Sequence, residues 1–420
     1  MPFTLLEKAS FTYNQAIRQA TFSPDGRYVI AAFDARTVKI CGQDNSGKWV
    51  EKGSLAHSTT TRSAAFSPDS RYVVTASKEA KIWALDDNDS WVEKASFFTH
   101  EDDIKSATFS SDGRRVLTIT FYGKTVKILS QDDNGSWMEK ASFTYKKTKC
   151  HSAAFSPDGR HVMTATYEKT AKIWEEDDSG RWVEKVSLDH SGCLNSAAFS
   201  PDGRYIVTAY NGGASIWVNN DDWKGATKTD LYHHPTTIDL ATFSPDNRHV
   251  VTISRDNMVT IWRKDDNGIW EKKGFCAHDA WIKSAIFSPN SRHMVTASND
   301  KTAKFLSQNN HGSWIEKASF THNGWVRSAV FRPDSRCVVT SSNDKTTKIW
   351  GKNSHGKWSQ KASFTHDGLA ISAVFSPNGR YVVAVSHNNT TNIFKIKIFK
   401  LLNSCNSKGP SPSKRRKFTD

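Results

Sequence analysis

The chain has 420 residues, of which 37% are hydrophobic, and a formal net charge of +14. No run approaches the ~18 apolar residues of a membrane helix, which excludes a helical membrane protein. Six cysteines lie scattered without metal-ligand spacing, and no basic segment followed by an apolar run begins the chain. We therefore expect a cytoplasmic protein with free thiols, no signal peptide and no membrane insertion. The positive charge indicates affinity for polyanions.

The first predicted element is a β-strand over Phe3 to Thr12. Its sequence matches a segment that recurs later, as in Trp91 to Phe97. No companion strands precede it, so we expect its partners to come from elsewhere in the chain.

From Phe22 onward one motif organises the sequence. Phe-Ser-Pro-Asp-Gly-Arg occupies residues 22–27 and returns eight times, identical or slightly altered. Its phenylalanines are spaced by 43 to 46 residues, a period typical of repeat architectures. The nine anchors are Phe22, Phe66, Phe109, Phe155, Phe199, Phe243, Phe287, Phe331 and Phe375.

Each period predicts four short strands, here termed a, b, c and d. The Pro-Asp-Gly turn joins strands a and b, such as Ile282–Ile286 and His293–Ser298. Strand c follows, as in Thr346–Trp350, and strand d follows an Asp/Asn/Gly turn, as in Trp137–Phe143. Repeated four-stranded units bury their faces against one another and form a ring. The prediction is all-β: a single β-propeller of about nine four-stranded antiparallel blades.

The last repeat supplies strands a, b and c between Phe375 and Phe394 but lacks strand d. Pairing the N-terminal strand with this blade closes the ring. Known propellers typically have 4–8 blades, so a ring of seven or eight with a displaced repeat is the alternative. We assign residues 1–402 to the propeller and residues 403–420 to a disordered basic tail. In this tail Lys414, Arg415, Arg416 and Lys417 match a nuclear import signal or a nucleic-acid contact.

Four features resemble WD repeats: the Pro-Asp-Gly turn, the serine near the end of strand b, the Asn-Asp turn and the closing Ile-Trp. The resemblance extends from about Phe3 to about Phe394. In WD-repeat β-propellers a His before strand a, a Ser/Thr on strand b, an Asp in the b–c turn and a Trp on strand c form a hydrogen-bonded set. Two copies match all four positions: His322, Ser342, Asp344 and Trp350, and His234, Ser254, Asp256 and Trp262. The resemblance implies a non-catalytic interaction scaffold.

Tryptophan gives the first site prediction. Thirteen of the fifteen tryptophans recur at fixed positions of the repeat, and packing between blades is sufficient to explain their presence there. Eight open strand d: Trp49, Trp91, Trp137, Trp182, Trp223, Trp270, Trp314 and Trp358. Trp281 and Trp325 do not recur with the repeat. They lie in d–a loops, six residues before their Phe anchors, and Leu369 holds the same position in the last copy. We expect them side by side on one rim as partner-binding residues, since Trp is enriched in binding hot spots; capping of their own blades is the alternative.

A second variable position lies four residues before each anchor. Around the ring, the residues at this position form a basic arc that is interrupted at Asn195 and Asp239. The members of the arc are Lys283, Arg327, Arg18, Arg62, Lys105 and His151. Such an arc suits an acidic or phosphorylated peptide. A solvated rim without a ligand is the alternative.

No nucleophile elbow, phosphate-binding glycine loop or paired zinc ligands occur in the sequence. The recurrent histidines stand one to a blade, so they cannot share an ion. We therefore predict no enzyme, cofactor or metal, and a monomeric propeller within a larger complex. The main hypothesis is a scaffold that binds an acidic protein or peptide on the d–a loop rim. The alternative is a binder of nucleic acid or acidic lipid, which uses the basic arc and the tail. The expected location is the cytoplasm, with the nucleus as the alternative if the tail is an import signal.

Overall fold

The computed structural model describes residues 3–13, 17–33, 36–97, 102–146, 148–220, 222–233 and 236–398. The predicted tail with its basic run lies outside these residues, as do His234 and the side chain of Arg18. Every regular element in the described ranges is a β-strand, which confirms the all-β class. Those ranges accordingly hold no helix with the length and apolar character needed to span a bilayer.

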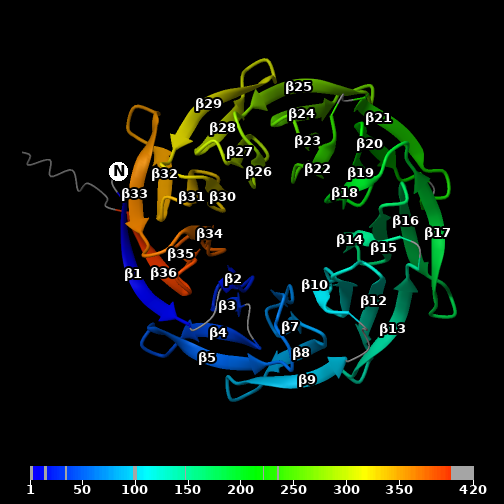
Figure 1. Ribbon diagram of the computed structural model, residues 1–420, viewed down its shortest axis with the longest axis horizontal. Helices are drawn as coiled ribbons and strands as arrows, with labels where there is room; N and C mark the ends of the chain where they lie inside the picture. Colours follow the sequence, from blue (N-terminus) through cyan, green and yellow to red (C-terminus); the bar gives the residue numbers. More distant parts are fainter. Residues whose placement is uncertain are drawn as a thin grey trace, which may run out of the picture.

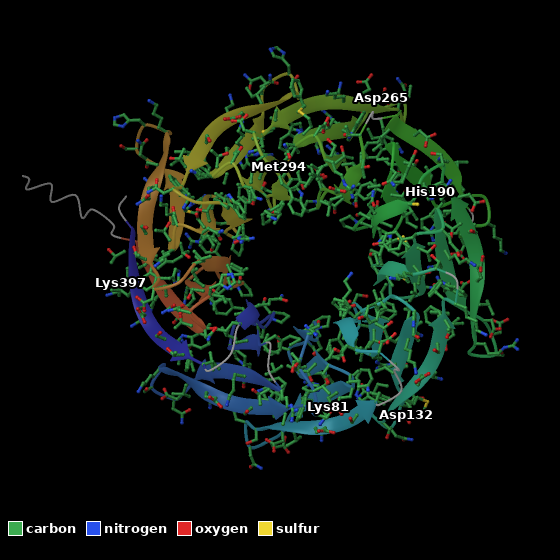
Figure 2. The ribbon with its side chains drawn as sticks, in the orientation of Figure 1. Lys81, Asp132, His190, Asp265, Met294 and Lys397 are labelled. Carbon is green, nitrogen blue, oxygen red and sulfur yellow. The ribbon has the colours of Figure 1, made fainter. Side chains whose placement is uncertain are left out.

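The described strands form nine four-stranded antiparallel blades around an open axis (Figure 1). Two adjacent blades are also joined by a single parallel pairing of Gly274 with Trp314. Strand a of each blade lies innermost and strand d outermost. In Figure 2 the drawn side chains leave the axis open, and Asp132 and Asp265 lie at c–d turns on the outer circumference. The a–b turns and the d–a loops therefore lie on opposite rims, because they join opposite ends of strand a.

The strands are assigned to blades in chain order. Blades 1 to 3 contain β2 (Ile17–Phe22), β3 (Tyr28–Phe33), β4 (Thr37–Gln43) and β5 (Trp49–Ala56); β6 (Ser63–Phe66), β7 (Tyr72–Ala76), β8 (Ala80–Leu85) and β9 (Trp91–Phe97); and β10 (Ile104–Phe109), β11 (Arg115–Thr120), β12 (Thr125–Gln131) and β13 (Trp137–Thr144). Blades 4 to 6 contain β14 (Cys150–Phe155), β15 (His161–Thr166), β16 (Thr170–Glu176) and β17 (Trp182–Asp189); β18 (Leu194–Phe199), β19 (Tyr205–Tyr210), β20 (Gly213–Val218) and β21 (Thr227–His233); and β22 (Ile238–Phe243), β23 (His249–Ser254), β24 (Met258–Lys264) and β25 (Trp270–Ala277). Blades 7 to 9 contain β26 (Ile282–Phe287), β27 (His293–Ser298), β28 (Thr302–Gln308) and β29 (Trp314–Thr321); β30 (Val326–Phe331), β31 (Cys337–Ser342), β32 (Thr346–Lys352) and β33 (Trp358–Thr365); and β34 (Ala370–Phe375), β35 (Tyr381–Ser386), β36 (Thr390–Ile398) and β1 (Phe3–Thr12).

Blade 9 combines the two ends of the chain. Strand β1 pairs antiparallel with β36, with Phe3 opposite Ile398 and Thr12 opposite Thr390. The N-terminal strand thus occupies the position of strand d in blade 9. Blade 9 lies between blades 8 and 1 in the ring (Figure 1).

The recurrent Phe-Ser-Pro-Asp-Gly-Arg motif forms the a–b hairpin turn. In blade 1 the Ser23 hydroxyl donates to Asp25 Oδ1 (2.6 Å), and the same oxygen accepts the Arg27 N–H (3.0 Å). Gly26 has a φ of 74°, a left-handed conformation that glycine adopts without strain. Local hydrogen bonds of this type define the turn, so the sequence predicts it well.

Tryptophans at the start of strand d fill the spaces between blades. Trp91 of blade 2 meets Tyr28 of blade 1 edge-on (5.6 Å between ring centroids) and Phe66 of its own blade (6.0 Å). One prediction in this set is wrong: Trp223 does not open strand d, because β21 begins at Thr227. Trp223 instead lies in the c–d turn at φ 68° and is 1% exposed.

Candidate functional site

In blades 7 and 8 the d–a loop and the b–c turn lie against each other on one rim. The Asn299 N–H donates to the Trp281 carbonyl (2.9 Å), and the Asn343 N–H donates to the Trp325 carbonyl (2.8 Å). Each tryptophan backbone is therefore fixed by the b–c turn of its own blade.

A buried polar chain beneath the rim of blade 8 holds these two segments together. The His322 Nδ1 atom lies 2.9 Å from Asp344 Oδ2, and its Nε2 lies 2.7 Å from Thr340 Oγ1. The same threonine hydroxyl accepts the Trp350 indole N–H (2.8 Å). The resemblance implied Ser342 for the serine or threonine position, and Thr340, which links the histidine to the tryptophan, was missed.

Ser342 lies at the other end of the same chain. Its hydroxyl accepts the Asp344 N–H (3.1 Å) and donates to the Gly324 carbonyl (2.9 Å), one residue before Trp325. Ser342 thus joins the b–c turn to the d–a loop and has no direct bond to Trp350.

The other copies retain parts of this arrangement. In blade 6 the Trp262 indole N–H donates to Thr252 Oγ1 (3.1 Å) and the Ser254 hydroxyl donates to Asp256. In blade 7 His278 contacts Asp300 (2.6 Å) and Thr296 (2.7 Å). The loop that bears Trp281 is therefore anchored like the loop that bears Trp325.

Burial decides the charge state of this network. It lowers the pKa of His322 to about 4, although the Asp344 carboxylate opposes the shift, so the imidazole is neutral near pH 7. Burial alone would raise the pKa of Asp344, but hydrogen bonds from Thr346 and the Asn323 N–H lower it to about 2. The network is structural, since each polar group is bound to another part of the same blade.

Both unusual tryptophans are exposed. Trp281 is 57% exposed and Trp325 46%, so neither is sealed inside its blade. The Lys283 ammonium lies 3.7 Å from the centre of the Trp281 ring, and the Arg327 guanidinium lies 5.4 Å from the Trp325 ring. Each indole is thus in contact with a cationic side chain that lies two residues after it in the sequence.

The two pairs lie in adjacent blades and affect each other. The pKa of Lys283 is lowered by burial and by the positive charge of Arg327. Arg327 is held by a bond from its Nε to Asn343 Oδ1 (2.8 Å). We name Trp281, Lys283, Trp325 and Arg327 the tryptophan patch.

A shallow groove of about 610 Å³ borders this patch between blades 6 and 7. Trp281 and Lys283 form one wall, and Leu240 and Ile253 supply apolar surface opposite. Asp239, predicted to interrupt the basic arc, pairs there with Arg255 (2.8 Å). Aromatic, apolar and cationic groups thus lie together around one depression.

The remaining predicted residues are more dispersed. Arg62 of blade 2 lies 3.7 Å from Asp103, and Lys105 of blade 3 donates to the His151 carbonyl (3.2 Å). Leu369 is half-buried beside blade 9. These residues share the rim with the tryptophan patch but belong to other blades.

Three exposed aromatic residues on the same rim were missed. Phe121 and Tyr122 occupy the b–c turn of blade 3, Tyr167 occupies that of blade 4, and all three are more than half exposed. Arg62 lies 5.7 Å from the Phe121 ring centre, and Lys149 lies 5.8 Å from that of Tyr122. Blades 7 and 8 have Asn-Asp at this turn. Phe121, Tyr122 and Tyr167, here named the aromatic cluster, therefore depart from the repeat as Trp281 and Trp325 do.

Comparison with known families decides the assignment. The model of the WD domain, G-beta repeat (WD40), matches seven segments that together cover more than half of the chain: residues 49–84, 139–175, 183–217, 225–263, 270–306, 314–351 and 358–395. The chain belongs to the WD40 family. A search of curated proteins found no match for this WD40 protein.

Solved structures show the same fold at low identity. Sqt1 from Chaetomium thermophilum superposes with a TM-score of 0.61 at 14% identity, covering 80% of this chain and 96% of Sqt1. The C-terminal WD40 domain of Sif2 gives a TM-score of 0.61 at 13% identity, covering 93% and 98%. Sqt1 bound to the N-terminus of the ribosomal protein L10 gives 0.60 at 15% identity, covering 80% and 96%.

Proposed function

We propose that this WD40 protein is a non-catalytic interaction scaffold that captures an acidic segment of a partner protein on its tryptophan patch. The observation that carries the proposal is the pairing of two exposed indoles with two cations on adjacent blades. Indoles supply large contact area at low conformational cost, and the cations select carboxylate or phosphate groups.

The neighbouring groove supports a peptide rather than a small molecule. It is open and shallow, and the apolar surface of Leu240 and Ile253 opposite Trp281 fits side chains of an extended segment. Sqt1 with the L10 N-terminus is an example of a protein of this fold that binds a chain terminus.

The test is capture of an array of acidic and phosphorylated peptides by the full chain. Trp281→Ala with Trp325→Ala should abolish capture and leave the melting temperature nearly unchanged. Phe275→Ala is the matched control, because Phe275 is 58% exposed, lies under Lys272 (4.6 Å) and stands on an outer strand. Equal capture by the double variant and wild type would disprove the assignment.

A second candidate function, polyanion binding, is favoured by the aromatic cluster of blades 3 and 4. Exposed rings flanked by Arg62 and Lys149 suit stacked bases of single-stranded nucleic acid. Affinity for an oligonucleotide should then fall steeply with salt and require Phe121 and Tyr122. Weak salt dependence would exclude this function.

A further inference from the structure

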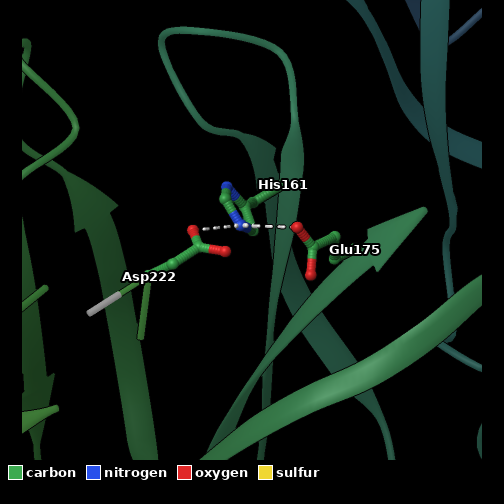
Figure 3. Close-up of side chains that lie close together, drawn as sticks. All are labelled: His161, Glu175 and Asp222. Carbon is green, nitrogen blue, oxygen red and sulfur yellow. Dashed lines mark ion pairs between the residues drawn. The ribbon is translucent and has the colours of Figure 1, made fainter. Parts of the chain in front are cut away.

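Three potential metal ligands meet between blades 4 and 5 (Figure 3). His161 begins β15 and lies directly opposite Glu175 of β16, while Asp222 reaches them from the c–d turn of the next blade. The His161 Nε2 atom lies 3.3 Å from Asp222 Oδ1 and 3.8 Å from Glu175 Oε1. The cluster lies apart from the tryptophan patch, near the opposite rim.

The imidazole nitrogen at the centre of this cluster lacks a hydrogen-bond partner among the described residues. His161 is only 4% exposed, and its Nε2 faces the two carboxylates within ion-pair distance. Imidazole nitrogen is a common metal ligand.

We propose that His161, Glu175 and Asp222 bind a divalent transition cation of the zinc type. Tetrahedral zinc with bonds of about 2.0–2.2 Å to nitrogen and oxygen places its ligand atoms about 3.3–3.6 Å apart. The separation between His161 and Asp222 already matches this value, and that between His161 and Glu175 is slightly longer. All three ligand atoms lie within 4.8 Å of one another. A water molecule would complete the fourth position. One nitrogen and two carboxylates suit zinc better than magnesium or calcium, which prefer oxygen alone.

Lys185 orients the carboxylates and also competes with the cation. Its ammonium binds Glu175 Oε2 and Asp222 Oδ2, which leaves the second oxygen of each carboxylate directed toward His161. Such outer contacts fix ligand orientation in metal sites. The positive charge lowers cation affinity by electrostatic repulsion, so the site binds zinc moderately rather than tightly.

Blade 1 shows the same location with a single carboxylate, that of Asp89. Tyr28 takes the position of His161, and its hydroxyl donates to Asp89 Oδ1 (2.5 Å), while Lys52 donates to Asp89 Oδ2 (2.6 Å). Gly42 stands opposite Tyr28, where Glu175 stands opposite His161. Blade 4 therefore retains the lysine–aspartate pair and adds one imidazole and one carboxylate.

The turn that supplies Asp222 is held in place before any cation arrives. Asp222 and Trp223 have φ values of 54° and 68°, which are unusual for residues other than glycine. The buried Trp223 side chain and a bond from its N–H to Asn219 Oδ1 (2.7 Å) fix this conformation. A bound cation therefore links two blades that the chain already presents in the right orientation.

The test is titration of chelator-treated full-length protein with zinc chloride, followed by calorimetry and by melting temperature. One site with micromolar affinity and a raised melting temperature is expected. His161→Gln and the isosteric Asp222→Asn should each weaken binding at least about tenfold, and Lys185→Gln should strengthen it. Circular dichroism confirms that each variant is folded.

His249→Gln is the matched control, because His249 occupies the same strand position in blade 6 and its Nε2 already accepts a bond from Gln308 (2.7 Å). This variant should bind zinc like wild type. Zinc binding that is equally strong in folded His161→Gln or Asp222→Asn would overturn the proposal and indicate other surface histidines. Absence of binding by wild type at micromolar zinc would overturn it as well.

Discussion

The Lys283 ammonium lies directly against the face of the Trp281 indole, 3.7 Å from the ring centre. The two side chains act as one recognition element, because the cation orders an exposed ring and the ring shields part of the cation from water. Arg327 and Trp325 repeat this relationship in the next blade at 5.4 Å.

The first prediction concerns this cation. Lys283→Met keeps the aliphatic stem and removes the charge, so affinity for an acidic peptide should fall. The free energy of unfolding should change by less than about 1 kcal/mol, the usual value of an exposed cation–π contact. Peptide titration and urea denaturation measure the two quantities. Lys272→Met, which removes the cation beside Phe275, should leave the affinity unchanged; an equal loss in both variants would contradict a local role for Lys283.

The second prediction compares two neighbouring hydroxyls on β31. Thr340→Val removes the partner of both His322 and Trp350 at constant shape and should destabilise the protein by about 1–3 kcal/mol. Ser341→Ala should be nearly neutral, because the Ser341 hydroxyl is buried and has no hydrogen-bond partner among the described residues. Urea denaturation distinguishes the two variants, and equal stabilities would show that the threonine link is dispensable.

The third prediction applies one substitution to two tryptophans. Trp223→Ala removes a ring that is 1% exposed and should cost about 3–5 kcal/mol, as for other large core truncations. Trp281→Ala removes a ring that is 57% exposed and should change stability by less than about 1 kcal/mol. Calorimetric melting curves provide the comparison. A large loss for Trp281→Ala would indicate that its role is structural.

The fourth prediction is a loss of stability in mild acid. Burial lowers the pKa of His190 from 6.5 to about 4, and His57 and His366 show the same shift. Between these values the unfolded chain binds protons that the native protein does not, so stability is complete above pH 6.5 and falls toward pH 4. Each such histidine contributes a slope of about 1.4 kcal/mol per pH unit.

The variant His190→Gln tests this origin. Its stability at pH 7 should be lower, because Thr208 loses the imidazole at 2.8 Å, but its slope between pH 6.5 and 4 should be shallower than that of wild type. Denaturant unfolding at several pH values measures both. An unchanged slope would assign the acid sensitivity to other groups.

Much of the ring was predictable because its determinants are local. The spacing of the nine Phe anchors and the hydrogen bonds of turns such as Ser23–Asp25 lie within short segments of sequence. The exposure of Trp281 and Trp325 followed from the same repeat, since packing requires no tryptophan at those positions.

Contacts between blades were harder to predict. His161 and Asp222 are 61 residues apart, as are Tyr28 and Asp89, but this contact becomes apparent only once neighbouring blades are placed side by side in the ring. The prediction of no metal site rested on cysteine spacing, on the absence of paired zinc ligands in the sequence and on the recurrent histidines before strand a, to which His161 does not belong. Thr340 was missed for another reason: Ser342, two residues along the same strand, satisfied the family pattern equally well.

The pairing of Phe3 with Ile398 has a consequence for biosynthesis. At translation rates of about 5–20 residues per second, the first strand waits roughly 20–80 s for its partner to leave the ribosome. During that interval β36 does not yet exist, and the nascent N-terminal strand offers unpaired amides and carbonyls to any other chain nearby. A chaperone that shields this strand until β36 has been synthesised would prevent such pairing, and overproduction without one should favour misassembled oligomers.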